Sequence, residues 1–202
     1  MEVDKVILRA VLSTLAAIVG LILFMILTLT FVFPSTMMKI TYDLGMDSAS
    51  VSNAKRAYSR TQDEYYIAFA TEVAIGADDD EEIAECGDLF IADEQFSEYC
   101  AARTAELGDV EGTYEQYVYG QVSVAKYRLG DKTGAVETAF AGLGESFPKN
   151  NAAVAVLLTA LTAKDAQTVG LVKTKMNELR SKLSSETEKT YFEEMFALAQ
   201  NG

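Results

Sequence analysis

The sequence contains no histidine, no tryptophan and only two prolines, at positions 34 and 148. Without histidine, neither a Ser–His nor a Cys–His pair can activate a nucleophile. The adjacent Ser181 and Lys182 would point in different directions on a helix, so they do not form a catalytic pair. We therefore predict that the chain is not an enzyme and uses no cofactor and no metal ion.

Two short motifs resemble ligand sites but have the wrong spacing. In "GDKTG", Lys132 and Thr133 lie between Gly130 and Gly134, whereas a phosphate-binding P-loop places Lys after its second glycine and follows a strand. The acidic run 78–82 lacks the alternation and central glycine of an EF-hand loop. We interpret the first motif as a bend between helices, and the second as the acidic start of a helix, where carboxylates complement the helix dipole.

A long apolar segment lies near the N-terminus. Residues 11–33 contain no charged side chain, and these 23 residues are enough to cross a bilayer as a helix. A cleaved signal peptide would have a shorter apolar core that ends in small residues, but this one ends in Phe31, Val32 and Phe33. We predict an uncleaved signal anchor that contacts the lipid bilayer through residues 11–33. The predicted domain organisation is a tail and anchor over 1–34 and a helical domain over 35–202.

The distribution of charge predicts the topology and limits the partners. Lys5, Arg9 and the amino terminus precede the apolar segment, and Lys39 is the only nearby cation after it. The positive-inside rule therefore places the tail in the cytoplasm and the domain outside the cell membrane, which we expect to be that of a bacterial envelope. Residues 35–202 carry 15 Lys and Arg against 28 Asp and Glu, so we expect no nucleic-acid binding.

The apolar segment also contains small residues four positions apart. Ser13 pairs in this way with Ala17, and Ala16 with Gly20. Such pairs permit close contact between membrane helices. A homodimer therefore remains an open alternative.

The rest of the chain has helical periodicity and few strand signals, which predicts an all-α fold. The predicted helices are Thr36–Leu44, Ser48–Thr61, Asp63–Gly76, Asp79–Ile91, Glu94–Glu106, Thr113–Leu129, Lys132–Ser146, Asn151–Ala163, Asp165–Leu183 and Ser185–Gln200. Short turns between antiparallel neighbours are typical of both a bundle and a solenoid of helix pairs.

A 34-residue interval separates comparable bends. Asp165 follows Asp131 by 34 residues, and Asp63 precedes Asp131 by twice that interval. The segment Gln116–Lys149 resembles a tetratricopeptide repeat. Its matching positions are Tyr119, Ser123, Tyr127, Leu129–Asp131, Ala135, Gly142, Leu143 and Pro148. Pro148 lies one residue later than the proline of the family pattern. The resemblance implies an α-solenoid of antiparallel helix pairs, and an irregular helical bundle is the alternative.

The same resemblance implies a concave groove that binds a protein partner. The matching groove positions of the best repeat are Tyr117, Gly120, Val124, Tyr127 and Arg128. An earlier copy contributes Arg56 and Arg60, which are one helical turn apart and could clamp a carboxylate of a peptide. In the alternative interpretation, these two arginines pair with Asp63 or Glu64 on the surface.

The two cysteines, Cys86 and Cys100, permit one disulfide. If the helices near 81–91 and 94–106 form a hairpin that bends near Asp93, the two side chains could face each other. The alternative is a pair of buried, unpaired thiols, since cysteine packs well in helical cores.

Together these features predict a membrane-anchored scaffold or adaptor that recruits a protein partner in a membrane or envelope complex. The alternative is an accessory single-pass subunit, whose apolar helix packs against other membrane helices while the domain caps the assembly.

Overall fold

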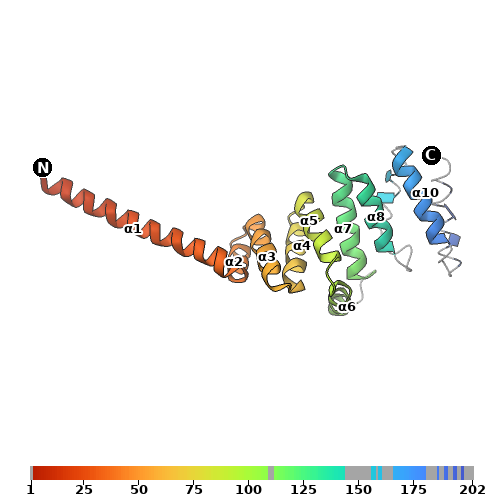
Figure 1. The fold of residues 1–202 in the computed structure, drawn as a ribbon, viewed down its shortest axis with the longest axis horizontal. Coiled ribbons are helices and arrows are strands. Elements are labelled where there is room, and N and C mark those ends of the chain that lie inside the picture. The colour runs from red at the N-terminus through yellow and green to blue at the C-terminus, as the bar shows by residue number, and fades with distance from the viewer. Residues whose placement is uncertain are drawn as a thin grey trace.

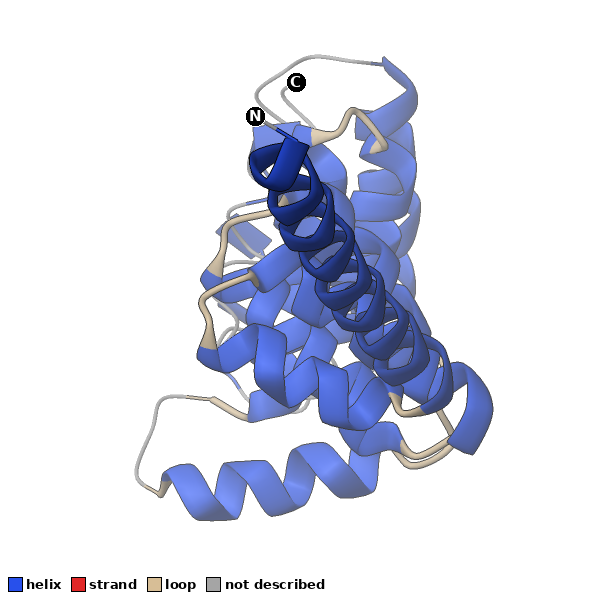
Figure 2. Ribbon diagram, turned by 90° about the vertical axis from the view of Figure 1, so that its left-hand side faces the viewer, coloured by secondary structure: helices blue, strands red, loops and turns tan. Residues whose placement is uncertain are grey.

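The computed structural model describes residues 2–108, 112–143 and 166–180, together with 156–157, 159–160, 186, 189–190, 193–194 and 197. Over these residues the protein is all-α, and Figure 2 shows helices and loops without a strand. The described helices are α1 (Glu2–Val32), α2 (Pro34–Asp43), α3 (Asp47–Thr61), α4 (Glu64–Gly76), α5 (Asp80–Ile91), α6 (Phe96–Leu107), α7 (Tyr114–Arg128), α8 (Lys132–Leu143) and α10 (Ala166–Arg180). The predicted all-α class is confirmed. The predicted Pro148 and most of the predicted helices 151–163 and 185–200 lie outside the described residues.

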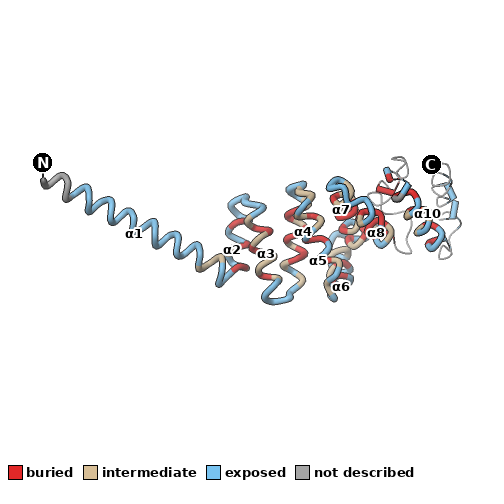
Figure 3. The backbone as a smooth tube through the Cα atoms, turned by 45° about the horizontal axis from the view of Figure 1, so that its top comes forward, coloured by how far each residue is buried: buried red, intermediate tan, exposed pale blue. Residues whose placement is uncertain are grey.

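Helix α1 projects from one end of a row formed by the other helices (Figure 1). Its segment Ile7–Val32 has a mean hydropathy of 2.8 and is not buried, so it is long and apolar enough to cross a membrane. Leu21 and Phe24 are each 70 % exposed, and Figure 3 shows exposure along nearly the whole helix. The prediction of an apolar N-terminal helix is confirmed. The helix already begins at Glu2, so the predicted tail is part of it.

Proline 34 ends α1 and begins α2. It has no N–H to continue the hydrogen bonds of α1, and its fixed φ suits the first turn of the next helix. The carbonyl of Phe33 accepts hydrogen bonds from the N–H groups of Thr36 and Met37. The domain therefore follows the apolar helix directly, without a linker.

The helices of the domain pack mainly on their neighbours in the row. Helix α2 packs on α3, α3 on α4, α4 on α5, α7 on α8 and α8 on α10. Helix α6 is the exception, because α5 packs directly on α7 and α6 contacts α7 from outside this succession (Figure 1). The predicted hairpin of 81–91 with 94–106 is therefore wrong.

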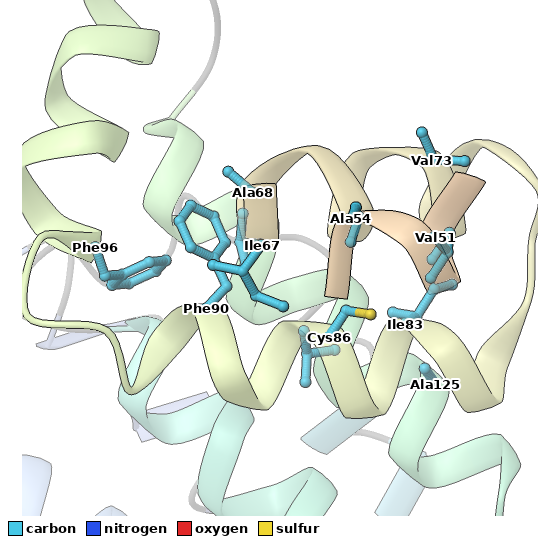
Figure 4. Packing of buried hydrophobic residues seen from close by; sticks show 14 of the residues in the cluster. Val51, Ala54, Ile67, Ala68, Val73, Ile83, Cys86, Phe90, Phe96 and Ala125 are labelled. Atoms are coloured by element: carbon cyan, nitrogen blue, oxygen red, sulfur yellow. The ribbon is translucent and has the colours of Figure 1, made fainter. Parts of the chain in front are cut away.

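The main hydrophobic core extends through the helices from α2 to α7, and Figure 4 shows part of it. Its largest fully buried side chains include Met38, Ile67 and Phe90, and each such burial contributes roughly 1.5–3 kcal/mol. Phe96 packs edge-on against Phe90 with a ring-centroid distance of 4.9 Å, and it also contacts Tyr119 at 5.6 Å. Phe96 thereby joins α6 to both α5 and α7. A second core cluster connects α8 with α10, around Leu143, Leu157 and Met176.

The helix ends follow the predicted capping chemistry. The Asp79 side chain accepts a hydrogen bond from the Glu82 N–H, which confirms the acidic run as a helix start. Gly130 turns the chain between α7 and α8 with a φ of +90°, a conformation that favours glycine. The Asp131 carboxylate then accepts the Gly134 N–H at 2.9 Å and caps α8. The predicted bend between two helices is confirmed.

The close approach of α5 to α7 depends on Gly87. A Cβ atom at this position would overlap the Val122 side chain, which is fully buried and stiff because it is β-branched. We predict that Gly87→Ala lowers the free energy of unfolding by about 1–3 kcal/mol. The measurement is urea unfolding of the detergent-solubilised chain.

The matched control is Gly170→Ala, because a Cβ atom at Gly170 meets open space. It should raise the free energy of unfolding by roughly 0.5–1 kcal/mol through helix propensity. The double variant Gly87→Ala/Val122→Ala should lose less than the sum of its single variants, because the overlap is removed. Additive losses would contradict the proposed contact.

Candidate functional site

Two adjoining hollows lie over the exposed face of α4. The first has a volume of about 440 Å³ and is lined by Glu72, Ile75, Gly76, Arg103, Leu107, Thr113, Tyr114 and Tyr117. The second has a volume of about 400 Å³ and is lined by Tyr42, Asp47, Phe69, Glu72, Val73 and Gly76. Because Glu72 and Gly76 line both hollows, we treat them as one surface, the α4 groove.

The sequence of α4 produces the floor of this groove. Phe69, Glu72 and Gly76, which line it, recur at intervals of three and four residues on one helix face, and Tyr65 continues this face without lining either hollow. The opposite face is buried through Ile67, Ala68, Ala70, Thr71 and Ala74. Gly76 has no side chain and leaves the floor open at this position. A Cβ atom there would meet nothing within 4 Å.

Aromatic rings line both ends of the α4 groove. Tyr42 of α2 packs edge-on against Phe69 of α4, with ring centroids 5.2 Å apart. Tyr117 and Tyr114 of α7 lie 6.0 Å apart at the other end. The tyrosine rings among them present an apolar body with a polar tip, a combination that is common at binding surfaces.

A polar network centred on Glu72 joins three helices in the middle of the groove. The Tyr114 hydroxyl donates a 2.7 Å hydrogen bond to Glu72 Oε1. Arg103 Nε of α6 lies 3.4 Å from the same oxygen, and Arg103 Nη1 donates to Glu106 at 3.0 Å. Burial, together with the hydrogen bond to Glu72, raises the pKa of Tyr114. Arg103 Nε is buried without a hydrogen-bond partner, so a donor remains unsatisfied beside the groove.

The structure separates the groove residues that the sequence predicted on α7. Tyr117 lines the α4 groove and is 45 % exposed. Gly120 is buried, and Val124 and Tyr127 are half-buried against the second core cluster. Arg128 forms ion pairs with two aspartates of the acidic run, Asp78 at 2.9 Å and Asp80 at 3.2 Å. Only Tyr117 of this set therefore belongs to the α4 groove.

Arg56 and Arg60 lie away from the groove, against the C-terminal end of α1. The Arg56 guanidinium stacks over the Phe31 ring, 5.4 Å from its centroid. Arg60 Nη1 donates a 3.4 Å hydrogen bond to the Val32 carbonyl. Within the described ranges, neither arginine forms an ion pair with Asp63, Glu64 or another carboxylate.

Cys86 and Cys100 are two buried free thiols in this structure, rather than the disulfide that the sequence permitted. The two helices contact each other through Phe90, Phe96 and Tyr99, and both cysteines pack as thiols in the same core cluster. Figure 4 shows Cys86 within the main core, near Ala54 and Ile83. Burial raises the pKa of each thiol to about 12. Both therefore stay protonated at neutral pH, and protonated thiols are poor nucleophiles.

Sequence reasoning missed most of the α4 groove. The stripe of Tyr65, Phe69, Glu72 and Gly76 was a usable signal, because it marks a second, partly apolar face on a helix that already has a buried face. The contributions of Arg103 and Tyr114 had no such signal, since they depend on where α6 and α7 pack.

Comparison with known proteins does not assign the chain to a family. No family model matches the sequence, and neither a curated protein nor a solved structure matches it. In the part of the chain that the structure describes, no group of three or more acidic or cysteine side chains is placed to hold a metal ion. The function is therefore inferred from the α4 groove and from helix α1.

The two free thiols give a direct test of the core. We predict that a thiol reagent labels neither Cys86 nor Cys100 in the native protein at neutral pH, because both are buried and protonated. After unfolding in denaturant without a reductant, both should react. Mass spectrometry measures the number of labels. An unfolded protein that accepts a label only after reduction would contradict the free thiols.

The Tyr114–Glu72 hydrogen bond should make the protein sensitive to alkali. The pKa of Tyr114 is raised in the folded state, so its contribution to stability is complete below the unfolded value of about 10 and is lost as the pH rises above it. We predict that the free energy of unfolding falls above pH about 10, and that Tyr114→Phe makes this fall less steep. Urea unfolding at a series of pH values measures both slopes. An unchanged slope in the variant would show that Tyr114 does not contribute.

Proposed function

We propose that this chain is a membrane-anchored helical-repeat scaffold that binds a segment of a protein partner in the α4 groove. The observation that carries the proposal is the groove itself, an open surface lined by Tyr42, Phe69, Tyr114 and Tyr117 around a central carboxylate. Open apolar surfaces with a few convergent polar groups are typical binding sites. Positioning a partner needs no catalytic group.

The proposed architecture is an α-solenoid of antiparallel pairs, α2 with α3, α4 with α5 and α7 with α8. Contacts between successive helices support it, with α6 as an insertion before the last of these pairs. Most groove residues come from α2, α4 and α7, the first helix of each proposed pair, and from α6, while Asp47 is the first residue of α3 and Thr113 caps α7. In tetratricopeptide arrays, which the segment 116–149 resembles, the first helices of the repeats line the concave groove.

We further propose that α1 crosses the cell membrane, with the tail in the cytoplasm and the domain outside it. The exposed apolar segment Ile7–Val32 supports the span, because so large an apolar surface is unfavourable in water. Lys5 and Arg9 support the orientation through the positive-inside rule. The scaffold would then hold its partner close to the membrane surface.

The charge of the domain indicates which partner segment would fit. Asp47 and Glu72 line the α4 groove, and the chain has a formal net charge of −13. A segment that carries both apolar and basic side chains would match the rings and the carboxylates together.

The alternative function is an accessory subunit whose α1 packs against other membrane helices. One observation favours it, since the small residues Ala16 and Gly20 share a face of α1 and a Cβ atom at Gly20 would meet open space. Such a face permits close contact with a second helix, from another subunit or from a second copy of this chain.

Site-specific photo-crosslinking in intact membranes would separate these two functions. A photoreactive amino acid is placed at Tyr117 in the groove, at Ile22 on α1 or at Leu129 on the exposed α7–α8 turn. All three side chains are 45–48 % exposed, so Leu129 is a matched control. We expect one defined protein crosslink at Tyr117 and none at Leu129. Crosslinks confined to Ile22 would favour the accessory subunit and contradict the groove.

The same crosslinking method can measure how much an aromatic residue of the groove contributes to partner binding. With the photoreactive group at Tyr42, the substitution Tyr117→Ala should reduce the apparent affinity for the partner about tenfold or more, because aromatic side chains often dominate binding energy. Leu129→Ala removes an equally exposed apolar side chain outside the groove and should leave the affinity unchanged. Equal effects of the two substitutions would show that the groove is not the binding site.

A further inference from the structure

The cations of the domain fall into two groups. One group is paired with carboxylates and includes Lys55 with Glu82 and Glu85, Arg103 with Glu72 and Glu106, Lys126 with Asp88, and Arg128 with Asp78 and Asp80. Arg56 and Arg60 differ, since they contact Asn53, the Phe31 ring and the Val32 carbonyl. Among the described residues of the domain, the other arginines, Arg103, Arg128 and Arg180, each form an ion pair with a carboxylate, whereas Arg56 and Arg60 form none.

Their position relative to α1 is defined by two contacts. The Arg56 guanidinium lies over Phe31, and Arg60 Nη1 reaches the carbonyl of Val32, the last residue of α1. The apolar segment also ends at Val32. Both guanidinium groups are therefore level with the end of the apolar segment, on its domain side.

If α1 crosses the membrane, the position of the two guanidinium groups relative to the lipids follows. The end of the apolar segment then coincides with the boundary between the hydrocarbon core and the lipid headgroups. Long arginine side chains at such a boundary place their charge among the headgroups while their stems remain on apolar surface. In Arg56 the guanidinium itself, rather than the stem, lies over the Phe31 ring, a cation–π contact that holds the charge at this boundary.

The guanidinium groups also keep hydrogen-bond donors available. A guanidinium has five N–H donors, and Arg60 uses one of them on Val32 while Arg56 uses one on Asn53. Arginine binds phosphate oxygens in a bidentate manner, and a net positive charge near the membrane surface favours anionic lipids. The two residues are one helical turn apart on α3, so both can face one lipid headgroup region.

We propose that Arg56 and Arg60 form a binding site for the phosphate of anionic phospholipid headgroups, next to the domain end of α1. The bound lipid holds α3 against the membrane surface and so sets the distance of the α4 groove from the bilayer. This inference rests on the membrane span proposed above.

Lipid selectivity of the full-length chain in vesicles tests the inference. The protein is reconstituted in phosphatidylcholine vesicles that contain traces of spin-labelled phosphatidylcholine or phosphatidylglycerol. Electron spin resonance measures the share of each label that the protein immobilises. One cation near an anionic surface strengthens binding to that surface about fivefold. The measured preference is averaged over all lipids around α1, so we expect phosphatidylglycerol to be preferred over phosphatidylcholine about two- to threefold.

The variants separate charge from position. Arg56→Gln/Arg60→Gln should reduce the preference to about one, and Arg56→Lys/Arg60→Lys should retain only part of it, because an ammonium keeps the charge but cannot bind phosphate in a bidentate manner. The matched control Lys132→Gln/Lys173→Gln removes the same charge from α8 and α10, at the far end of the row in Figure 1, and should leave the preference intact. High salt should weaken the preference, because it screens charges at the surface.

Each outcome decides a different claim. If the protein immobilises neither label, α1 does not cross the bilayer and the proposed membrane anchor fails. Equal immobilisation of both labels by the natural sequence overturns the lipid site but leaves the anchor. A Gln variant that keeps its preference, even with lower thermal stability, shows that the arginines only brace α1 against α3.

Discussion

The direct packing of α5 on α7 is the contact on which the other features of the domain depend. It requires Gly87, because any side chain at that position would overlap Val122. Once these two helices are in contact, α6 has no place between them and packs instead on the outside of α7. Arg103 and Leu107 of α6 then become one wall of the α4 groove. A single close approach in the core therefore positions a surface that a protein partner could use.

Charge is distributed unevenly over this scaffold. Ion pairs such as Lys126 with Asp88 and Arg128 with Asp80 join α7 to α5 and help to hold the row together, although each exposed pair contributes little by itself. Arg56 and Arg60 take no part in this pairing and gather at the end of the apolar helix. Under the proposed function, one end of the row would face lipid headgroups while the acidic remainder faces solvent and the partner.

Sequence reasoning succeeded where local patterns act alone. The apolar segment, the capping of α5 by Asp79 and the bend at Gly130 and Asp131 all follow from a few neighbouring residues. It failed where two distant segments must meet. The hairpin expected around Asp93 assumed that neighbouring helices pair, but the fit of Gly87 to Val122 favours α7 over α6 as the partner of α5.

The sequence by itself determined the all-α class, the position of the apolar helix and most helix boundaries, because hydrophobic periodicity, caps and glycine act over one or two turns. Only the tertiary structure decided which side chains share a surface. It separated Gly120, Val124, Tyr127 and Arg128 from Tyr117, and it moved Arg56 and Arg60 from the expected groove to the end of α1. The physical reason is that the neighbours of a helix depend on the shapes of side chains far apart in the chain, which no local pattern records.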